Sequence, residues 1–275
     1  HLQTKLTPGG LIDGWRRLSE LLLTWYEQIA EAAKNSAHLH ADETGWRING
    51  QGCWLWCFTN DRNCYYMIEY CRGSPVLQKF FTEAFDGVLI TDFWAAYDSV
   101  DAADRQKCLP HLLRELEKVD LRNDSAEWQA FAKKLRRLLR DGIRLRKRPD
   151  FEPGKFQSRV DRLNVRLARL AGEEHLDGDT RRLTKRLRKY AEYLFTFLDY
   201  PDVPHDNNFG ERQIRPAVIL RKNSQSNRSD RGAATQAVLM SVYRTLKLRG
   251  LNPTKTIADA LKTYLSTGQL PPLPD

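Results

Sequence analysis

The chain has 275 residues, with 44 Lys and Arg against 35 Asp and Glu, and therefore carries a net charge of +9. Its 41% hydrophobic and 29% charged residues exclude a disordered protein, and no apolar run reaches the roughly 18–20 residues that cross a membrane. Five cysteines, an odd number in a chain of this size, favour a reducing cytoplasm over a disulfide framework.

Residues 1–36 form the first predicted segment. The chain starts with His1 rather than Met and with no signal-peptide pattern, so we expect it to be cut from a longer protein. Apolar residues spaced alternately by four and three predict one helix over residues 11–33. They are Leu11, Trp15, Leu18, Leu22, Trp25 and Ile29. This stripe can pack on the domain core or form a dimer seam, and its short length favours the core.

Residues 37–123 form the first part of the predicted catalytic domain, because the apolar period changes to two. Strands are predicted over 37–44, 53–59, 64–70, 88–91 and 105–109, and helices over 74–85, near 95 and over 111–119. Asn49-Gly50 is a strong hairpin-turn signal after the first strand. A three-strand meander followed by crossover units predicts an α/β protein with a ribonuclease-H-like mixed five-stranded sheet and flanking helices.

Residues 124–200 are predicted to be an all-helical insertion in that domain. Helical apolar patterns run over 128–139, 156–170 and 183–198, and Asp179-Thr180 is the predicted cap of the third helix. The catalytic domain returns over residues 201–275, with helices predicted over 208–220 and 233–248 and a last one after Pro253.

The net charge is divided unevenly along the chain. It is −6 over residues 1–127, +10 over 128–200 and +5 over 201–275. This asymmetry predicts an anionic polymer as partner, and nucleic acid fits best. Solvated Arg-rich helix faces are the alternative interpretation of the same charges.

Two aspartates at strand ends are candidate metal ligands. In a ribonuclease-H-like order the first and fourth strands are neighbours, so Asp42 and Asp92 would face each other across about 5 Å. Carboxylates that close favour a divalent cation between them, and hard oxygen ligands suit Mg²⁺. A third carboxylate would complete a two-ion site. Glu211 is the better candidate because it lies on a predicted helix next to Arg212, although sequence spacing alone does not exclude Asp206. Alternatively, each aspartate only caps the turn after its strand.

Four sequence blocks resemble, in order, the signatures of one family. They are His40-Ala41-Asp42-Glu43-Thr44-Gly45-Trp46; Thr91-Asp92 with Ala95-Ala96-Tyr97; Cys108-Leu109-Pro110-His111-Leu112-Leu113-Arg114; and Asn207-Asn208-Phe209-Gly210-Glu211-Arg212 with Arg215-Pro216 and Arg221-Lys222-Asn223. Together they resemble bacterial DDE transposases of the insertion-sequence-sixty-six type over about residues 35–265. Phe93 departs from the pattern, because many relatives have Gly after the second Asp. Relatives also carry an upstream Cys-rich zinc-binding module and DNA-binding region that this chain lacks.

The resemblance implies a function, a cofactor and partners. Asp42, Asp92 and Glu211 would be the catalytic and metal-binding residues, with Mg²⁺ as cofactor and Mn²⁺ as a substitute. The activity would be phosphodiester hydrolysis at transposon ends followed by 3′-OH strand transfer into target DNA. We expect a homodimer or larger assembly on paired DNA ends. We expect it in the bacterial cytoplasm, associated with the nucleoid when bound to DNA. A structure-selective nuclease on the same fold and a non-catalytic DNA-binding derivative are the alternatives.

The candidate DNA-binding residues come from the family blocks and from the basic insertion. They are His111, Arg114, Asn207, Asn208, Arg212, Arg215, Arg221, Lys222 and Asn223, and in the insertion Arg136, Arg140, Arg182 and Arg186. His111 and Arg114 share a helix face, and residues 221–223 precede a polar loop suited to phosphate contact. Ordinary surface residues and a solvated loop are the alternatives.

The cysteines and tryptophans of this region are weaker candidates. Cys53, Cys57, Cys64 and Cys71 are predicted to lie within alternating strands, which favours buried thiols over a zinc site. Trp46, Trp54, Trp56 and Trp94 can stack on an extruded base, but such residues more often belong to a core.

Overall fold

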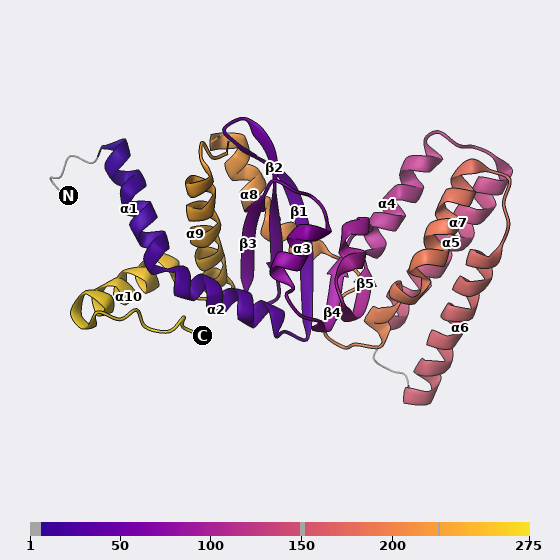
Figure 1. Ribbon diagram of the computed structural model, residues 1–275. Helices are drawn as coiled ribbons and strands as arrows, with labels where there is room; N and C mark the ends of the chain where they lie inside the picture. Colours follow the sequence, from indigo (N-terminus) through magenta and orange to yellow (C-terminus); the bar gives the residue numbers. More distant parts are fainter. Residues whose placement is uncertain (1–6, 149–151, 225) are drawn as a thin grey trace. The chain divides into compact units, whose positions relative to one another are not determined.

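A five-stranded sheet organises the chain in the computed structural model, which describes residues 7–148, 152–224 and 226–275 (Figure 1). The strands are β1 (His38–Ile48), β2 (Gln51–Thr59), β3 (Cys64–Glu69), β4 (Phe85–Thr91) and β5 (Ala102–Lys107). Their order is β3-β2-β1-β4-β5, with β1–β2 and β2–β3 antiparallel. The predicted α/β class, the mixed five-stranded ribonuclease-H-like sheet and the neighbouring first and fourth strands are confirmed.

The helices and the sheet divide into two compact units. The α-helices are α1 (Pro8–Leu21), α2 (Leu23–Lys34), α3 (Ser74–Phe80), α4 (Leu109–Asp120), α5 (Ala126–Arg146), α6 (Pro153–Gly172), α7 (Gly178–Tyr190), α8 (Asn208–Ser224), α9 (Asp230–Leu248) and α10 (Pro253–Thr267). Short 3₁₀ helices are η1 (Ala95–Ser99), η2 (Ala191–Tyr193) and η3 (Thr196–Leu198). Unit 1 comprises the described residues of 7–87, 95–103 and 208–275, and unit 2 comprises those of 88–94 and 104–207.

A two-residue turn sets the register of the first hairpin in unit 1. Asn49 and Gly50 have φ values of 50° and 78°, and two positive φ angles are typical of the type I′ turn that Asn-Gly favours. Ile48 pairs with Gln51 directly across this turn. The same register places Asp42 opposite Cys57 and Glu43 opposite Trp56. The predicted Asn-Gly hairpin is therefore confirmed.

Strands β1–β3 bury both of their faces. On one face Cys57 and Tyr66 belong to a core cluster with Ile214 and Ala217 of α8, and α9 joins the same cluster. On the other face the rings of Phe58 and Phe80 stack at 4.0 Å between centroids. Because side chains alternate along a strand, Asp42 lies on the α8 face and Glu43 on the opposite one.

Helix α9 covers the outer edge of the sheet in unit 1. The Ser241 hydroxyl accepts the backbone N–H of Tyr66 at 2.8 Å, and the Thr245 hydroxyl accepts that of Cys64 at 3.0 Å. These N–H groups belong to β3, an edge strand of the sheet. Side-chain hydroxyls therefore occupy positions where another strand would otherwise pair.

The N-terminal stripe divides between core and surface. The single predicted helix over 11–33 is interrupted at Leu22, which separates α1 from α2. Leu22, Trp25 and Ile29 are fully buried in a cluster with α9 and α10, and the Trp25 indole N–H donates to the Pro271 carbonyl at 2.7 Å. Trp15 of α1 is 55% exposed. The second half of the stripe therefore packs into the core, and Leu18 of the first half packs against the same cluster.

Unit 2 contains the predicted helical insertion. Helices α4, α5, α6 and α7 pack around one apolar core that includes Trp128, Leu139, Leu163 and Leu187. Several predicted helix boundaries are wrong. Helix α7 is capped by Asp177, whose carboxylate accepts the Thr180 N–H, and it ends at Tyr190 before two 3₁₀ turns. In unit 1, α3 ends at Phe80 rather than near 85, because β4 already begins there.

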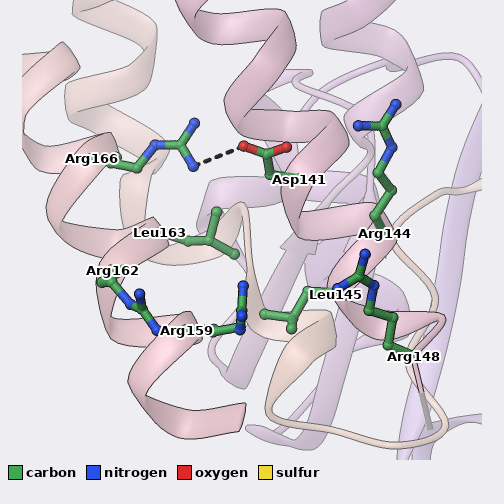
Figure 2. A pocket seen from close by; sticks show the side chains of 8 residues that line it. All are labelled: Asp141, Arg144, Leu145, Arg148, Arg159, Arg162, Leu163 and Arg166. Carbon is green, nitrogen blue, oxygen red and sulfur yellow. Dashed lines mark hydrogen bonds and ion pairs between the residues drawn. The ribbon is translucent and has the colours of Figure 1, made fainter. Parts of the chain in front are cut away.

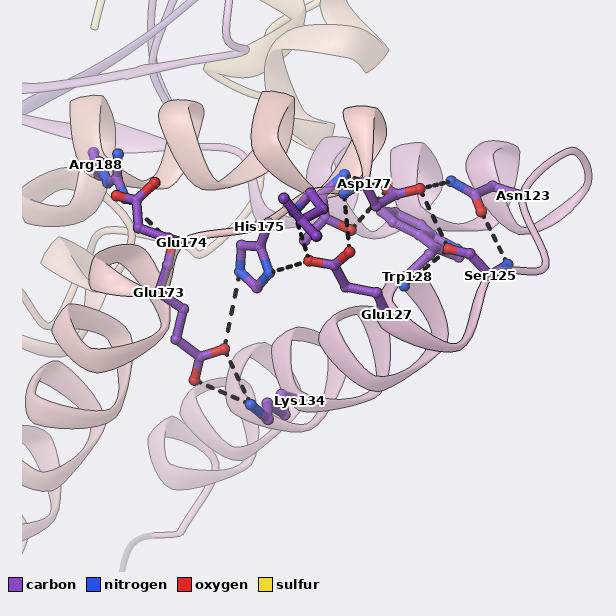
Figure 3. Close-up of polar contacts among 12 residues, drawn as sticks. Asn123, Ser125, Glu127, Trp128, Lys134, Glu173, Glu174, His175, Asp177 and Arg188 are labelled. Carbon is purple, nitrogen blue, oxygen red and sulfur yellow. Dashed lines mark hydrogen bonds and ion pairs between the residues drawn. The ribbon is translucent and has the colours of Figure 1, made fainter.

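A polar network holds the loop between α6 and α7 on the start of α5 (Figure 3). The Glu127 carboxylate accepts the backbone N–H groups of Leu176 and Asp177 at 3.0 and 2.9 Å, and it lies 3.0 Å from His175 Nδ1. Asp177 in turn accepts hydrogen bonds from Asn123 and from the first turn of α7. Both carboxylates are therefore bound in their ionised form.

This network predicts acid sensitivity of unit 2. Burial opposes ionisation, but hydrogen bonds from Asn123, Thr180 and Ser125 lower the Asp177 pKa from 3.8 to about 2. A lowered folded-state pKa contributes stability that is present above about pH 4 and is lost as the pH falls toward 2. We expect Asp177→Ala to cost about 1–2 kcal/mol at pH 7 and to flatten the pH dependence of melting between pH 4 and 2. Thermal melts tracked by circular dichroism, with exposed Asp161→Ala as the control, measure both effects; equal pH slopes for wild type and Asp177→Ala would contradict the assignment.

Candidate catalytic site and nucleic-acid contacts

Asp42 lies on β1 beneath α8 in unit 1. It opposes Cys57 in the β1–β2 register, and Cys57 packs with Ile214 and Ala217 of α8. Burial raises the pKa of the Cys57 thiol well above its usual value, and the neighbouring Cys64 and the Asp42 charge add to this rise. The half-buried Asp42 carboxylate accepts the backbone N–H of Glu43 at 2.9 Å. It is thus an ionisable group on a largely apolar face.

Glu211 lies in the first turn of α8, which packs on β1 and β2. The rings of His40 on β1 and Phe209 on α8 lie 5.5 Å apart. His40 and Asp42 share one face of β1, because they are two residues apart. Phe209 and Glu211 share the first turn of α8, so this contact brings the turn that carries Glu211 onto the strand that carries Asp42. Asp206, the alternative third carboxylate, precedes α8 and lies 3.7 Å from His205.

Asp92 directly follows β4, in unit 2. Its carboxylate accepts the backbone N–H of Trp94 at 2.8 Å, so it caps the turn, as the alternative interpretation expected. One oxygen serves that bond, and a carboxylate has about four acceptor positions, which leaves capacity for a metal. Lys107, fully buried on β5, donates to the Thr91 hydroxyl at 3.0 Å, and that hydroxyl donates to the Asp92 carbonyl at 2.9 Å.

Glu43, next to Asp42, has a different environment. Its side chain is 2% exposed and accepts Nε and Nη2 of Arg72 at 3.0 and 2.8 Å. The Tyr97 hydroxyl also donates to this carboxylate. Two of the sequence blocks therefore meet through Glu43 and Tyr97, a structural connection that the sequence did not predict. Asp42 and Glu43 are neighbours in sequence, but they lie on opposite faces of β1 and contact different residues.

Basic residues of β1, of α8 and of the segment after α8 line a hollow of about 880 Å³ in unit 1. Its basic residues are Arg47 of β1, Arg221 and Lys222 of α8, and Arg228. Arg221 also donates to the Gly45 carbonyl, which ties α8 to β1. Asn223, at the exposed end of α8, lies just before the polar loop, whose residue 225 is outside the described part. The loop is held to the hairpin, because Asn227 exchanges backbone hydrogen bonds with Arg47 and Asn49.

Other predicted contact residues differ in accessibility. Asn208, Arg212 and Arg215 are exposed on α8, and the Arg212 guanidinium lies 5.6 Å from the Phe209 ring centroid. On α4, Arg114 is exposed and His111 half-buried. Asn207 is 1% exposed, and its backbone N–H contacts Cys108 Sγ at 3.2 Å.

The basic residues predicted in the insertion mostly contact acidic side chains of α4. Arg182 and Arg186 both pair with Glu115, and Arg136 pairs with Asp120. Arg140 is exposed and forms no ion pair within the described part of the chain. These contacts were not predicted, because the partners lie on a helix distant in sequence. Their positive charge is partly compensated within the protein.

The cysteines and tryptophans have mainly structural positions. Cys53, Cys57, Cys64 and Cys108 are buried and reduced, whereas Cys71 is exposed and follows β3 rather than lying in it. Trp46 and Trp56 belong to the core. Trp54 packs against the Arg72 guanidinium at 4.3 Å, and Trp94 is exposed.

Comparison with known proteins decides the family. A family model described as "Transposase IS66 family" matches residues 1–235 of the chain. The chain belongs to the IS66 transposase family. This is the insertion-sequence-sixty-six family that the four sequence blocks resemble. Membership supports a transposase role in general terms.

Two relatives of this IS66 family chain come from Sinorhizobium fredii. One, named "Uncharacterized protein y4qI", is 25% identical over 265 residues, which are 86% of the chain and 49% of the relative. The other, "Uncharacterized protein y4jD", is 37% identical over 73 residues, 26% of the chain and 14% of the relative. The matches thus cover about half or less of each relative. Among the described helices of this chain, none combines the length and apolar character needed to cross a membrane.

Proposed function

We propose that this chain is the catalytic portion of a Mg²⁺-dependent DNA transposase, with Asp42, Asp92 and Glu211 as metal ligands. The observation that carries the proposal is the contact of the first turn of α8 with β1, which places the Glu211 turn over the face that holds Asp42. Membership of the IS66 family supports the reaction class. In this proposal Asp206 has no catalytic part.

The three side chains suit a divalent ion. All are carboxylates, and Mg²⁺ and Mn²⁺ prefer such hard oxygen ligands. Asp42 and Glu211 are half-buried, which limits competition from water while leaving access for a ligand. When bound, the ion would act as a Lewis acid on the scissile phosphate, stabilising negative charge on its oxygens.

The proposed chemistry has two displacements at phosphorus. In the first, a water oxygen bonds to phosphorus at the element end while the bond to the 3′ oxygen breaks, leaving a 3′-OH and a 5′-phosphate. In the second, that 3′ oxygen bonds to a target phosphorus and loses its proton to solvent, and the target 3′ oxygen leaves. Neither step requires a covalent bond to the protein. The basic residues predicted to bind DNA would hold the phosphates in line.

DNA and further copies of the chain are the proposed partners. Arg221 and Lys222, together with Arg47 and Arg228 in the same hollow, offer phosphate contacts beside β1. His111 and Arg114 on α4, and separately Arg212 and Arg215 on α8, are further proposed contacts. The functional segments 1–36, 37–123, 124–200 and 201–275 remain the proposed division of these roles. Assembly on paired ends is part of the same proposal.

Removal of metal is expected to abolish the reaction. The test uses the full-length protein, a plasmid carrying the ends of its own element, and a duplex oligonucleotide with a pre-cleaved 3′-OH end. We expect nicking and joined product with Mg²⁺ or Mn²⁺, and neither product with EDTA, measured on sequencing gels. Cleavage without joining would support the nuclease alternative, and DNA binding without any metal-dependent product would support a non-catalytic derivative; either result overturns the proposal.

A further inference from the structure

Two rows of basic side chains run along the seam between α5 and α6 in unit 2. On α5 the row is Lys134, Arg137, Asp141 and Arg144, and Arg148 follows just after the helix. On α6 it is Arg159, Arg162, Arg166 and Arg169, and Glu173 follows just after the helix. In both rows the spacing alternates between three and four residues. Side chains at this spacing share one face of a helix, so each row follows the axis of its helix.

The two rows enclose adjoining hollows, which together we call the α5–α6 groove. One hollow, of about 340 Å³, is lined by five arginines and Asp141 above Leu145 and Leu163 (Figure 2). The other, of about 280 Å³, is lined by Lys134, Arg137, Arg166 and Arg169 with Glu173. Arg166 lines both, so the hollows are adjacent along the seam.

The charges of the α5–α6 groove are strongly unbalanced. Its two rows contain eight basic and two acidic residues, a net charge of +6. The acidic residues each pair with one base, Asp141 with Arg166 at 2.8 Å and Glu173 with Lys134 at 3.0 Å. The rows therefore keep an excess of positive charge. This contrasts with Arg182 and Arg186, which share Glu115 of α4.

We propose that the α5–α6 groove binds the phosphate backbone of DNA. Seven of its eight basic residues are arginines, whose planar guanidinium matches two phosphate oxygens at once. At 1.5 Å per residue, the helical row from Lys134 to Arg144 extends about 15 Å, which is long enough to contact more than one phosphate of a strand. A polyanion matches this repeated charge better than a single small anion does.

The choice of DNA as the polyanion rests on the proposed transposase function. Phosphate contact alone carries no sequence information, so the groove would add affinity for any DNA rather than recognition of an end sequence. The residues first predicted for this role, Arg136, Arg140, Arg182 and Arg186, do not line these hollows. The α5–α6 groove is therefore an additional contact surface within the insertion.

Charge reversal in the groove tests the proposal. The full-length protein with Arg144→Glu and Arg162→Glu is titrated with a labelled 30-base-pair duplex of mixed sequence, in EDTA, between 50 and 200 mM salt. We expect the Kd at 100 mM salt to rise on the order of 30-fold and the slope of log Kd against log salt to fall by about two. The matched control, Arg181→Glu with Lys185→Glu, reverses two exposed charges of α7 and is expected to change Kd less than about threefold.

The outcomes separate this proposal from the proposed catalytic function. Equal Kd values for groove and control variants would overturn the groove proposal while leaving metal-dependent cleavage untouched. Loss of binding in the groove variant together with no cleavage by the wild type would leave the groove proposal standing and overturn the catalytic one. At least tenfold tighter groove-dependent binding of an RNA duplex of the same sequence would overturn DNA as the occupant. If the reversal unfolds the protein, Arg144→Gln with Arg162→Gln is measured instead, with a smaller rise in Kd expected.

Discussion

Replacing Asp42 by Asn is expected to lower the rate of metal-dependent DNA cleavage about a thousandfold or more. The substitution keeps the size of the side chain and an oxygen that accepts the Glu43 N–H, but it removes the charge that would hold a divalent ion. Losing several kcal/mol of charge stabilisation in the transition state corresponds to this factor. Single-turnover cleavage of the pre-formed protein–DNA complex at saturating Mg²⁺ measures it, with DNA affinity recorded in parallel.

Glu211→Gln and Asp92→Asn are expected to give losses of similar size. The matched controls are Asp206→Asn and Asp202→Asn, because both acids precede α8 and Asp206 was the alternative candidate for the third ligand. Both controls should retain cleavage within a few-fold of wild type. Full activity of Glu211→Gln combined with loss in Asp206→Asn would show that the third carboxylate is misassigned. Wild-type cleavage by all three triad variants would refute the metal site itself.

Replacing Glu43 by Ala is expected to destabilise unit 1 by about 1.5–3 kcal/mol, because it removes a buried carboxylate that accepts hydrogen bonds from a charged and from a neutral donor. The Glu43 side chain is 2% exposed and binds both Arg72 and Tyr97. Its loss would remove one acceptor from the Arg72 guanidinium and from the Tyr97 hydroxyl. Denaturant unfolding followed by tryptophan fluorescence measures the change in unfolding free energy.

A matched control for Glu43 lies on β3. Glu69 pairs with Lys79 at 2.7 Å near the surface, where such pairs contribute about 0–1 kcal/mol, so Glu69→Ala should be mild. Comparing Asp42→Asn with Glu43→Ala then distinguishes the proposed catalytic role of Asp42 from the structural role of Glu43. We expect the first to retain the wild-type melting temperature and lose activity, and the second to lose stability. Equal stability of Glu43→Ala and Glu69→Ala would exclude the structural role.

Local patterns predicted much of the sheet, because strand signals are short-range. The Asn49-Gly50 turn and the alternation of apolar and polar residues predicted the β1–β2 hairpin. The strand order was predicted because the elements follow one another as in a ribonuclease-H-like fold. The interruption at Leu22 was missed, since no Pro or Gly marks it and the apolar stripe continues across it. The cap at Asp177 was missed because its partners include Asn123, far away in sequence.

Side-chain partners were the part of the candidate site that the sequence did not predict. The pairing of Glu43 with Arg72 and Tyr97 joins three separate segments, and charge counting could not distinguish Glu43 from Asp42. The Glu115 contacts of Arg182 and Arg186 required the packing of α4 near α7. The three–four spacing of the arginine rows was present in the sequence. That the two rows face one another depends on α5 packing against α6.

The type I′ turn at Asn49 and Gly50 sets which face of the sheet the Asp42 and Glu43 side chains lie on. With two residues in the turn, Asp42 faces the apolar cluster under α8 and Glu43 faces Tyr97. One residue more or fewer would shift the pairing of β1 by a single position, and each side chain would move to the opposite face. Asp42 would then lie on the face of Arg72 and Tyr97, and Glu43 would lie beneath α8. The Asn49-Gly50 turn, which contacts neither acid, thereby separates the proposed metal ligand Asp42 from the buried ion-pair residue Glu43.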